Sequence, residues 1–326
     1  MEATSTSHPK GLYFLYSTEM WERFNFYGMR AILSLFLVSA LSFKQDEAAI
    51  LYGGFLGLSY LTPMLGGYIS DRYIGNRNSI VWGGFGMAIG QLLLFSSAST
   101  FATDIPLATN LMWGGLVFLI FGNGFFKPNI SSMVGQLYEK GDNRLDAAFT
   151  IFYMGINTGA MLGMLICPWL GDVKVDGVRV IEAFKWGFLA AGVAMLIGTL
   201  SFFLFKSVFL KAPDGSDIGL APTFSDVKSA EKETEKAEFS TQSIIITCIL
   251  FVGLILGFHY LFVTEVANPI KDWIYPIIYS AGISLAFLIM SDKTLTKIER
   301  DRIWVMYFVA FFVISFGQPM NRPGLL

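Results

Sequence analysis

The sequence predicts an all-α polytopic membrane protein, and three observations support this. Of the 326 residues, 54% are hydrophobic and only 15% are charged, whereas soluble domains average about 45–50% apolar and about 25% charged residues. The apolar residues gather in runs of about 20 or more, which is the length that a helix needs to cross a bilayer. Lys and Arg gather in alternate connections between these runs, as the positive-inside rule describes.

We expect nine membrane spans and a cytoplasmic N-terminus. The expected spans are residues 13–41, 49–70, 79–98, 107–137, 146–170, 185–210, 242–263, 270–290 and 303–316. With this topology most of the Lys and Arg residues between spans lie on the cytoplasmic side. The residues left on the outer side are Lys44, Lys174, Arg179, Lys185 and Lys271.

Composition argues against several classes of function. The net charge of -2 and the lack of a basic stripe interleaved with aromatic residues disfavour a nucleic-acid partner. His8 lies in a polar tail, His259 is isolated in an apolar run, and no metal-ligand or nucleophile pattern accompanies them. Cys167 and Cys248 lie inside apolar runs, where a small hydrophobic side chain is the simplest interpretation. We therefore expect neither an enzyme nor a bound cofactor.

One long polar segment divides the chain. It ends in "SDVKSAEKETEKAEF", where acids and bases alternate, and this pattern is typical of a solvated linker or surface helix. The expected parts are a cytoplasmic tail at 1–12, a six-helix transmembrane bundle at 13–210, a charged cytoplasmic linker at 211–240, a transmembrane helical pair at 241–290 and a last segment at 291–326.

Glycines recur four residues apart in two of the spans. They are Gly155, Gly159 and Gly163 in "GINTGAMLG", together with Gly86 and Gly90. Small residues at this spacing let two transmembrane helices approach closely, and this explains them better than a phosphate-binding loop does.

The first span carries four charges on one side. At 100° per residue Glu19, Glu22, Arg23 and Arg30 fall, with Phe26 and Tyr27, inside an arc of about 140°. A charge at the bilayer centre costs roughly 2.5–3.5 kcal/mol on insertion scales, so this face must meet protein or water. It is either a functional site, as intramembrane ionisable residues usually indicate, or a structural ion-pair cluster that joins helices.

A second charge lies deep in the fourth span, in "FGNGFFKPNISS". Lys127 could reach for an interface, but a buried partner such as Glu22 is the preferred explanation. Pro128 follows it and frees the carbonyl of residue 124. In the fifth span Thr150, Tyr153 and Asn157 fall within about 60° of arc. They form a second inward polar line, or they serve only hydrogen bonding between helices.

These residues carry a resemblance to a known family. Glu19-x-x-Glu22-Arg23-Phe24, followed by Tyr27 and Arg30, resembles the ExxERFxYY signature of the proton-dependent oligopeptide transporters (POT/PTR) of the major facilitator superfamily, with Phe26 in place of the first tyrosine. The segment "GGYISDRYIGNR" resembles the superfamily's loop between helices two and three, which implies that Asp71 and Arg72 pin neighbouring helix ends.

The resemblance implies a fold. Residues 13–210 would be the N-terminal six-helix bundle of a major facilitator, built as two inverted three-helix repeats. The pair at 241–290 would be the helices that bacterial members insert between their halves, and 291–326 would be an incomplete seventh family helix with an aberrant C-terminus.

The resemblance also implies a site, facing one central cavity. Tyr27, Arg30, Tyr60 and Lys127 would hold a peptide's carboxylate, Asn157 would bond its backbone, and Tyr153 would line the same cavity. The expected proton-coupling residues are Glu19, Glu22, Arg23 and Lys127. In this scheme Glu22 alternates between a salt bridge to Lys127 and protonation.

The implied function is symport of di- and tripeptides with protons across a bacterial cytoplasmic membrane. A facilitator that carries another small solute, such as a sugar or nitrate, is one alternative, and a membrane receptor or scaffold that transports nothing is another. The group of Glu19, Glu22, Arg23 and Lys127 favours the peptide carrier, because a carrier of neutral solutes has no evident need for it.

The C-terminal end departs from the family pattern. The family's seventh helix carries Phe-Trp and then Glu-Gln, whereas this chain reads "SFGQPMNRPGLL". Met320 is encoded only by ATG and Asn321 only by AAT or AAC, so reading from the third base of ATG gives GAA, a glutamate codon. We therefore expect that the reading frame shifts near Ile314, that the second six-helix half is lost, and that the chain alone is inactive.

Overall fold

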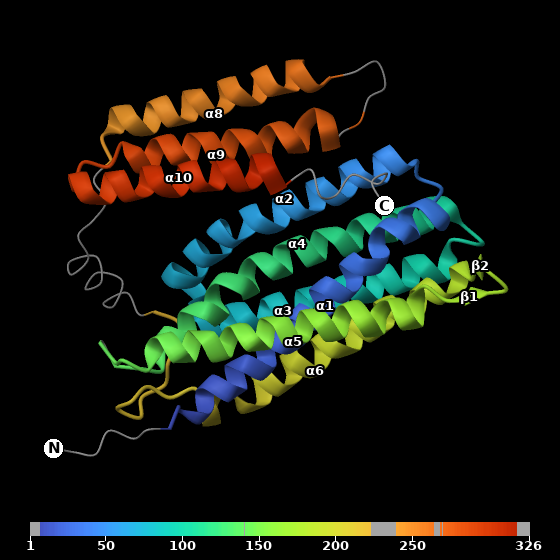
Figure 1. Ribbon diagram of the computed structural model, residues 1–326, viewed down its shortest axis with the longest axis horizontal. Helices are drawn as coiled ribbons and strands as arrows, with labels where there is room; N and C mark the ends of the chain where they lie inside the picture. The colour runs from blue at the N-terminus through green and yellow to red at the C-terminus, as the bar shows by residue number, and fades with distance from the viewer. Residues whose placement is uncertain (1–6, 140, 223–238, 264–267, 269, 318–326) are drawn as a thin grey trace. The chain divides into compact units, whose positions relative to one another are not determined.

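A computed structural model of the chain describes residues 7–139, 141–222, 239–263, 268 and 270–317, and these residues are almost entirely helical (Figure 1). The chain forms two compact units, Met1–Val227 and Lys228–Leu326. The all-α fold expected from the composition is confirmed.

The first unit holds six long helices and one short hairpin. Its helices are α1 (Lys10–Ser39), α2 (Gln45–Ile69), the π-helix η1 (Ser70–Ile74), α3 (Gly75–Thr100), α4 (Ile105–Gln136), α5 (Leu145–Gly171), the 3-10 helix η2 (Ile181–Ala183) and α6 (Phe184–Phe209). Between α5 and α6, β1 (Lys174–Val175) pairs antiparallel with β2 (Val178–Arg179). Asp176 and Gly177 have positive φ angles, as a two-residue hairpin turn requires.

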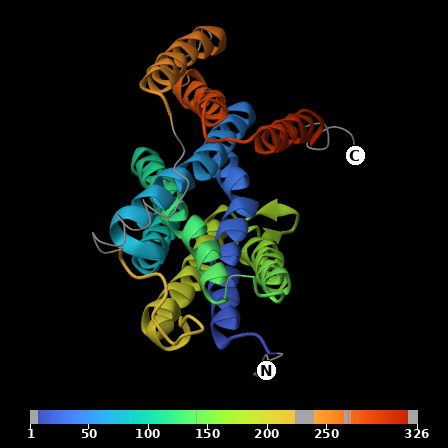
Figure 2. The ribbon, with the colours of Figure 1, turned by 90° about the vertical axis from the view of Figure 1, so that its left-hand side faces the viewer.

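Helix pairing in this unit repeats after three helices. The first helix, α1, packs against α5 and α6, and Figure 2 shows it between them. Correspondingly, α4 packs against α2 and α3, while α3 and α6 pack against each other. If α1, α2 and α3 are exchanged with α4, α5 and α6 in that order, the same list of helix pairs results. Two three-helix repeats, as the family resemblance implies, produce such a pattern.

The glycine stripes lie at the closest helix contacts, as their spacing predicted. On α5, a Cβ at Gly155 would lie 2.9 Å from the Tyr16 carbonyl oxygen of α1, and one at Gly163 would meet the carbonyl oxygen of Phe24. Between α3 and α4 the contact is reciprocal, since Gly90 and Gly115 each leave room for the other's carbonyl oxygen at 2.8 Å. These pairs of backbones can approach only where side chains are missing.

The second unit contains α8 (Thr241–Phe262), the π-helix η3 (Ile270–Ile274), α9 (Tyr275–Met290) and α10 (Lys297–Gly317). The Ser240 hydroxyl caps α8 by accepting a hydrogen bond from the Ser243 amide at 3.0 Å. The Phe258, Phe262 and Tyr279 rings meet where α8 packs on α9. The helical pair expected at 241–290 is therefore present as a hairpin of two helices.

Six stretches of described helix are long and apolar enough to cross a membrane. They are Gln45–Thr100, which contains both α2 and α3, Ile105–Gln136, Leu145–Gly171, Ile181–Phe209, Thr241–Phe262 and Ile270–Met290. The spans expected at 13–41 and 303–316 are not among them, because α1 and the start of α10 carry several ionisable residues each. Helix length and composition thus support a multi-pass protein, but they do not support all nine of the expected spans among the described residues.

Several expected boundaries differ from the structure. The first helix begins at Lys10 rather than at residue 13, because its first turn is not apolar and gave no signal in the hydropathy pattern. Residues 211–222 of the expected linker pack against the first unit, whereas 223–238 lie outside the described residues. Met320 and Asn321, on which the expected frameshift depends, also lie outside the described part of the chain.

A glycine substitution at the contact between α1 and α5 should destabilise the first unit. At Gly159 a Cβ would meet the Met20 carbonyl oxygen, which is backbone and cannot rotate away. We expect Gly159→Ala to lower the free energy of unfolding by about 1–3 kcal/mol, as overpacking does. Gly135→Ala is the matched control, because nothing lies within 4 Å of its added Cβ. Thermal unfolding in detergent measures both, and equal stability of the two variants would contradict close packing at Gly159.

Candidate functional site

Three charged residues form a buried cluster on α1. The Arg23 guanidinium Nε lies 2.6 Å from Glu19 Oε1 and 2.9 Å from Glu22 Oε2. The side chains of Arg23, Glu19 and Glu22 are 5%, 2% and 0% exposed, so the cluster is shielded from lipid. The prediction that this face meets protein is therefore confirmed for these three residues.

The cluster depends on the glycine stripe of α5. A Cβ at Gly159 would lie 2.9 Å from the Cβ of Arg23, so α5 passes directly over the arginine stem. The next contacts along α1 follow the same stripe: Tyr16 Oη donates to Thr158 Oγ1 at 3.3 Å, and Gly28 faces Cys167. The close approach of α5 excludes lipid and water from one side of Arg23.

The carboxylates of the cluster keep unused acceptor capacity. Glu19 Oε2 and both oxygens of Glu22 are buried without a hydrogen-bond partner among the described residues. Leaving a buried acceptor unpaired costs about 1–3 kcal/mol, and more when the group is charged. A proton on Glu22 would remove part of that cost, because a protonated carboxyl is neutral. The cluster is thus chemically suited to taking up a proton.

Arg30 lies two turns further along α1, in an aromatic surround. Its Nε donates to Tyr52 Oη of α2 at 2.8 Å. Its guanidinium carbon lies 5.5 Å from the ring centroid of Phe26, 5.3 Å from that of Tyr27 and 5.6 Å from that of Tyr52. Rings at these distances stabilise a cation through their π faces without neutralising its charge.

Lys127 of α4 is held in a similar way. Its ammonium lies 4.6 Å from the ring centroid of Tyr60, an exposed residue of α2, and Lys127 itself is half-buried. The expected pairing of Lys127 with Glu22 is wrong for this structure, in which the ion pair of Glu22 is with Arg23. Arg23 is adjacent in the chain and enclosed with Glu22, whereas α4 makes only a small contact with α1.

The turn that carries Lys127 is shaped by Pro128. Pro128 has no amide hydrogen, so the carbonyl of Gly124 loses its helical partner. Gly66 of α2 lies against that carbonyl, where an added Cβ would overlap the oxygen. One turn earlier, Thr62 Oγ1 donates to the Ile120 carbonyl at 3.0 Å. The second helix thus packs tightly on α4 and brings Tyr60 to Lys127.

The polar residues of α5 are less closely placed. Tyr153 and Asn157 are exposed in the described structure and do not touch the buried cluster. Thr150 bonds back to the Asp146 carbonyl at 3.0 Å, within its own helix. The interpretation of Thr150 as a link between helices is therefore wrong, while the expected roles of Tyr153 and Asn157 stay predictions.

The loop motif departs from the expectation in a different way. Asp71 and Arg72 are exposed in η1, and the Arg72 guanidinium lies 4.8 Å from the ring centroid of Tyr68, four residues earlier in the chain. The residue of this motif that ties helix ends together is Arg77, which is 4% exposed and donates to the Leu210 carbonyl at the end of α6. The motif itself does not predict that its last residue, Arg77, is buried.

Two contributors to the site were missed from the sequence. Tyr52 binds Arg30, and its spacing of two helical turns from Tyr60 was the available signal. Asn123 is 1% exposed with an unpaired Oδ1, and it lies one turn before Lys127 on α4. The spacing of Asn123 and Lys127 places both on one face of the helix.

Comparison with known proteins gives a consistent result. A profile of the POT family matches residues 77–317. A peptide transporter of Yersinia enterocolitica is 30% identical over 97% of this chain and 59% of its own length. Dipeptide and tripeptide permease A of Chromobacterium violaceum is 34% identical over 61% of this chain and 37% of its own length. The chain thus spans about half the length of the curated relatives it matches.

Solved structures agree with the relatives. A POT family transporter crystallised with 5-aminolevulinic acid superposes with a TM-score of 0.68 at 28% identity, covering 95% of this chain and 58% of that one. A POT family transporter in complex with a thioalcohol-conjugated peptide gives a TM-score of 0.65 at 27% identity, covering 95% and 58%. The fold expected from the sequence, including the helices beyond the first six, is thereby confirmed.

Removal of Arg23 should destabilise the first unit. In Arg23→Leu the two carboxylates of Glu19 and Glu22 stay buried without their cation, and breaking a buried pair in this way costs about 3–5 kcal/mol. The control is Arg72→Leu, an exposed arginine whose loss should change stability by less than about 0.5 kcal/mol. Thermal unfolding in detergent at neutral pH compares them. If the two variants unfold at the same temperature, the cluster is not holding α1 in place.

Proposed function

Because this chain belongs to the POT family, we propose that it forms the N-terminal part of a carrier that moves di- and tripeptides together with protons. The proposal rests on the surroundings of the Arg30 and Lys127 side chains. Among the described ion pairs neither cation has a carboxylate partner, and both lie against aromatic rings instead. Two half-buried, unneutralised cations suit an incoming carboxylate.

A peptide supplies that carboxylate. Every di- and tripeptide has one terminal carboxylate, whatever its side chains, so a site for the whole class must bind the chain ends and the amides. Arg30 can grip a carboxylate with two parallel hydrogen bonds, and Lys127 adds a mobile point charge. Tyr27 and Tyr60, already stacked on these cations, would flank the same end of the peptide. Tyr153 and Asn157 would bond its backbone from α5.

Two named relatives support peptides over other solutes. The Yersinia protein is called a peptide transporter and the Chromobacterium protein a dipeptide and tripeptide permease. A sugar has no carboxylate to match the two cations. Nitrate has the right charge but lacks the amides and the second terminus for which the polar side chains of α5 would be suited.

The proton would be taken up by the α1 cluster. Glu22 Oε1 has no partner among the described residues and Oε2 makes only the ion pair with Arg23, while Arg23 is also paired with Glu19. A peptide carboxylate that engages Arg30 and Lys127 would add a negative charge to the site that contains Glu22, and so would favour the protonated form of Glu22. Peptide and proton would then bind together, which is the condition for symport.

We also propose the topology and the division of the chain. The protein would lie in a bacterial cytoplasmic membrane with its N-terminus inside, since the loops rich in Lys and Arg then face the cytoplasm. The helices α1 to α6 would form the substrate-binding bundle, with residues 211–222 packed on it, and 241–290 would be a pair inserted before the family's seventh helix. Alternating access would need a second bundle to rock against the first.

Uptake of a labelled dipeptide tests the proposal. Proteoliposomes would contain either the 326-residue chain or the full product of its gene, with an inward proton gradient imposed. We expect the full product to accumulate dipeptide, unlabelled tripeptide to compete with it, and glucose and nitrate to leave it unchanged. Competition by glucose or nitrate at similar concentration would favour one of the other solute classes. No uptake under any gradient would favour a receptor or scaffold.

Lys127 should be essential to the driven reaction. In the transporting form, Lys127→Ala removes one of the two cations that would bind the substrate carboxylate, so proton-driven accumulation should fall by at least about tenfold. Lys185→Ala is the control, because that lysine lies over Trp186 at the start of α6 and belongs to no part of the site. Accumulation by Lys127→Ala at the rate of the control would exclude Lys127 from coupling.

A further inference from the structure

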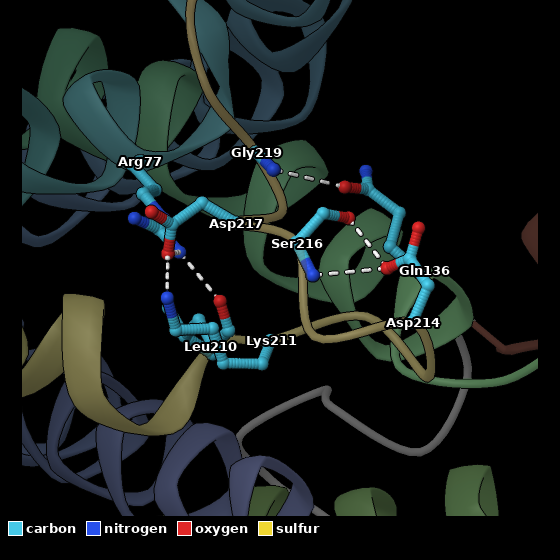
Figure 3. A network of polar contacts seen from close by, with 8 residues as sticks. All are labelled: Arg77, Gln136, Leu210, Lys211, Asp214, Ser216, Asp217 and Gly219. Atoms are coloured by element: carbon cyan, nitrogen blue, oxygen red, sulfur yellow. Dashed lines mark hydrogen bonds and ion pairs between the residues drawn. The ribbon is translucent and has the colours of Figure 1, made fainter.

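The chain folds back on the first unit as soon as α6 ends, and Arg77 holds it there (Figure 3). Arg77 Nη2 donates to the Leu210 carbonyl at 2.5 Å and to Asp217 Oδ1 at 3.0 Å. The Arg77 backbone amide donates to the Gly219 carbonyl at 2.9 Å. Lys211 Nζ adds a second cation 2.9 Å from Asp217 Oδ1. One buried arginine thus binds both ends of the returning segment.

A tight turn brings Asp217 back to Arg77. The Ala212 amide donates to the Ser216 carbonyl at 2.8 Å, and Gly215 adopts a φ of 84°. Asp214 Oδ1 accepts hydrogen bonds from the amide and hydroxyl of Ser216 at 2.9 and 2.6 Å. This turn is local and touches neither α3 nor α4 through Asp214. Its geometry reverses the chain, whereas the Arg77 contacts attach it.

The returning segment fits closely against the start of α3. Gly75 has a φ of 75°, and a Cβ there would lie 2.5 Å from the Ala221 amide nitrogen. Gly219 has a φ of 69°, and a Cβ there would lie 2.9 Å from the Met133 methyl carbon of α4. Leu210 and Ile218 are buried at 0% and 6% exposure. Gly75 thus allows a backbone contact that a side chain would prevent, and Gly219 leaves room for the Met133 side chain. The positive φ angles of both positions also favour glycine.

Hydrogen bonds continue from this segment into α4. The Gly219 amide donates to Gln136 Oε1 at 3.1 Å, and Gln136 Nε2 donates to Asn76 Oδ1 at 3.4 Å. Asn76 Nδ2 then donates to Asn129 Oδ1 at 2.9 Å. Asn129 Nδ2 donates in turn to the Phe125 carbonyl at 2.6 Å. The chain of amides therefore ends on the turn of α4 that holds Pro128.

We propose that residues 210–221 are a clasp, anchored on Arg77, that fastens the ends of α3, α4 and α6 to one another and is coupled through Asn76 to the α4 turn carrying Lys127. The clasp lies at the end of the bundle where the chain leaves towards the second unit, and it does not depend on which solute the protein carries. A displacement of the α4 turn would pull on Asn129, Asn76 and Gln136 in sequence. Movement of α4 would thus be transmitted through these hydrogen bonds to the clasp.

The charges of the clasp favour a closed state at neutral pH. Hydrogen bonds from Lys211 and Arg77 hold the pKa of Asp217 below its usual range. The ionised form of Asp217, and with it both ion pairs, therefore persists below the ordinary carboxyl pKa, and the stability that it contributes is lost as the pH falls from that ordinary value through the lowered one. Opening the clasp would separate Arg77 from the Asp217 carboxylate and the Leu210 carbonyl, so these contacts stabilise the closed state.

Hydrogen exchange of the 326-residue chain in detergent or nanodiscs tests the anchor. Asp217→Asn keeps the shape and the acceptor but removes the charge, and it should speed exchange in peptides covering residues 216–221 by at least about tenfold. Asp214→Asn, in the same turn and bonded only to Ser216, is the matched control and should change that exchange far less. If 216–221 already exchange at the rate of an unstructured peptide, or if both variants behave alike, the clasp does not exist.

A second pair of variants tests the coupling. Asn76→Ala interrupts the amide chain and should also speed exchange at 216–221, by about threefold or more. The hydrogen bonds of Asn76 reach the segment only through Gln136, and alanine keeps the Cβ that lies beside Gly219. Asn78→Ala is the control, since Asn78 is exposed two residues further on and bonds only to the Ile74 carbonyl. Unchanged exchange in Asn76→Ala, with a clear effect of Asp217→Asn, would overturn the coupling to α4.

Discussion

Burial of three ionised side chains on α1 is the constraint around which the first unit is arranged. Two carboxylates and one guanidinium cannot face lipid, and burying them requires that both carboxylates lie close to the one cation. Glu19 and Glu22 therefore converge on Arg23, and α5 must approach closely enough to seal the arginine. That approach requires glycine at Gly159 and at its neighbours along the stripe. The charged motif and the glycine stripe are two parts of one solution.

The charges of the site do not balance within the protein. Glu19 and Glu22 face Arg23, Arg30 and Lys127, so three cations and two carboxylates leave one excess positive charge. Aromatic rings hold Arg30 and Lys127 without cancelling that charge, because a π face offers only a quadrupole. One substrate carboxylate would cancel this excess positive charge, and a proton on Glu22 would then produce one excess positive charge again. Under the proposed mechanism, binding of an anion and uptake of a proton would therefore be linked through the charge of the site.

Helical periodicity in the sequence predicted which residues share a helix face. It did not predict which residues from different helices contact one another, because that depends on the tertiary structure. Helical phase placed Glu19, Glu22 and Arg23 on one face, and glycine spacing identified the contacts of α5 with α1 and of α3 with α4. The partners of each charge were harder to foresee. Arg23 and Lys127 are equally plausible partners of Glu22 on charge alone, and the choice depends on how near α4 comes to α1. The burial of Arg77 likewise depends on where residues 210–221 go, which no local pattern specifies.

The unit combines tight and loose contacts, and their distribution follows its polar groups. Glycine brings the backbones together between α1 and α5 and between α3 and α4, and the clasp adds hydrogen bonds where α3, α4 and α6 end. The unpaired acceptors instead include Glu22 and Asn123, on the two helices α1 and α4 that make only a small contact with each other. Satisfied, interlocked regions resist opening, whereas buried acceptors without donors gain hydrogen bonds when water, a proton or a ligand arrives. Buried acceptors without a hydrogen bond therefore lie on both α1 and α4, although the clasp is not fully satisfied either, since Arg77 Nε also has no hydrogen-bond partner among the described residues.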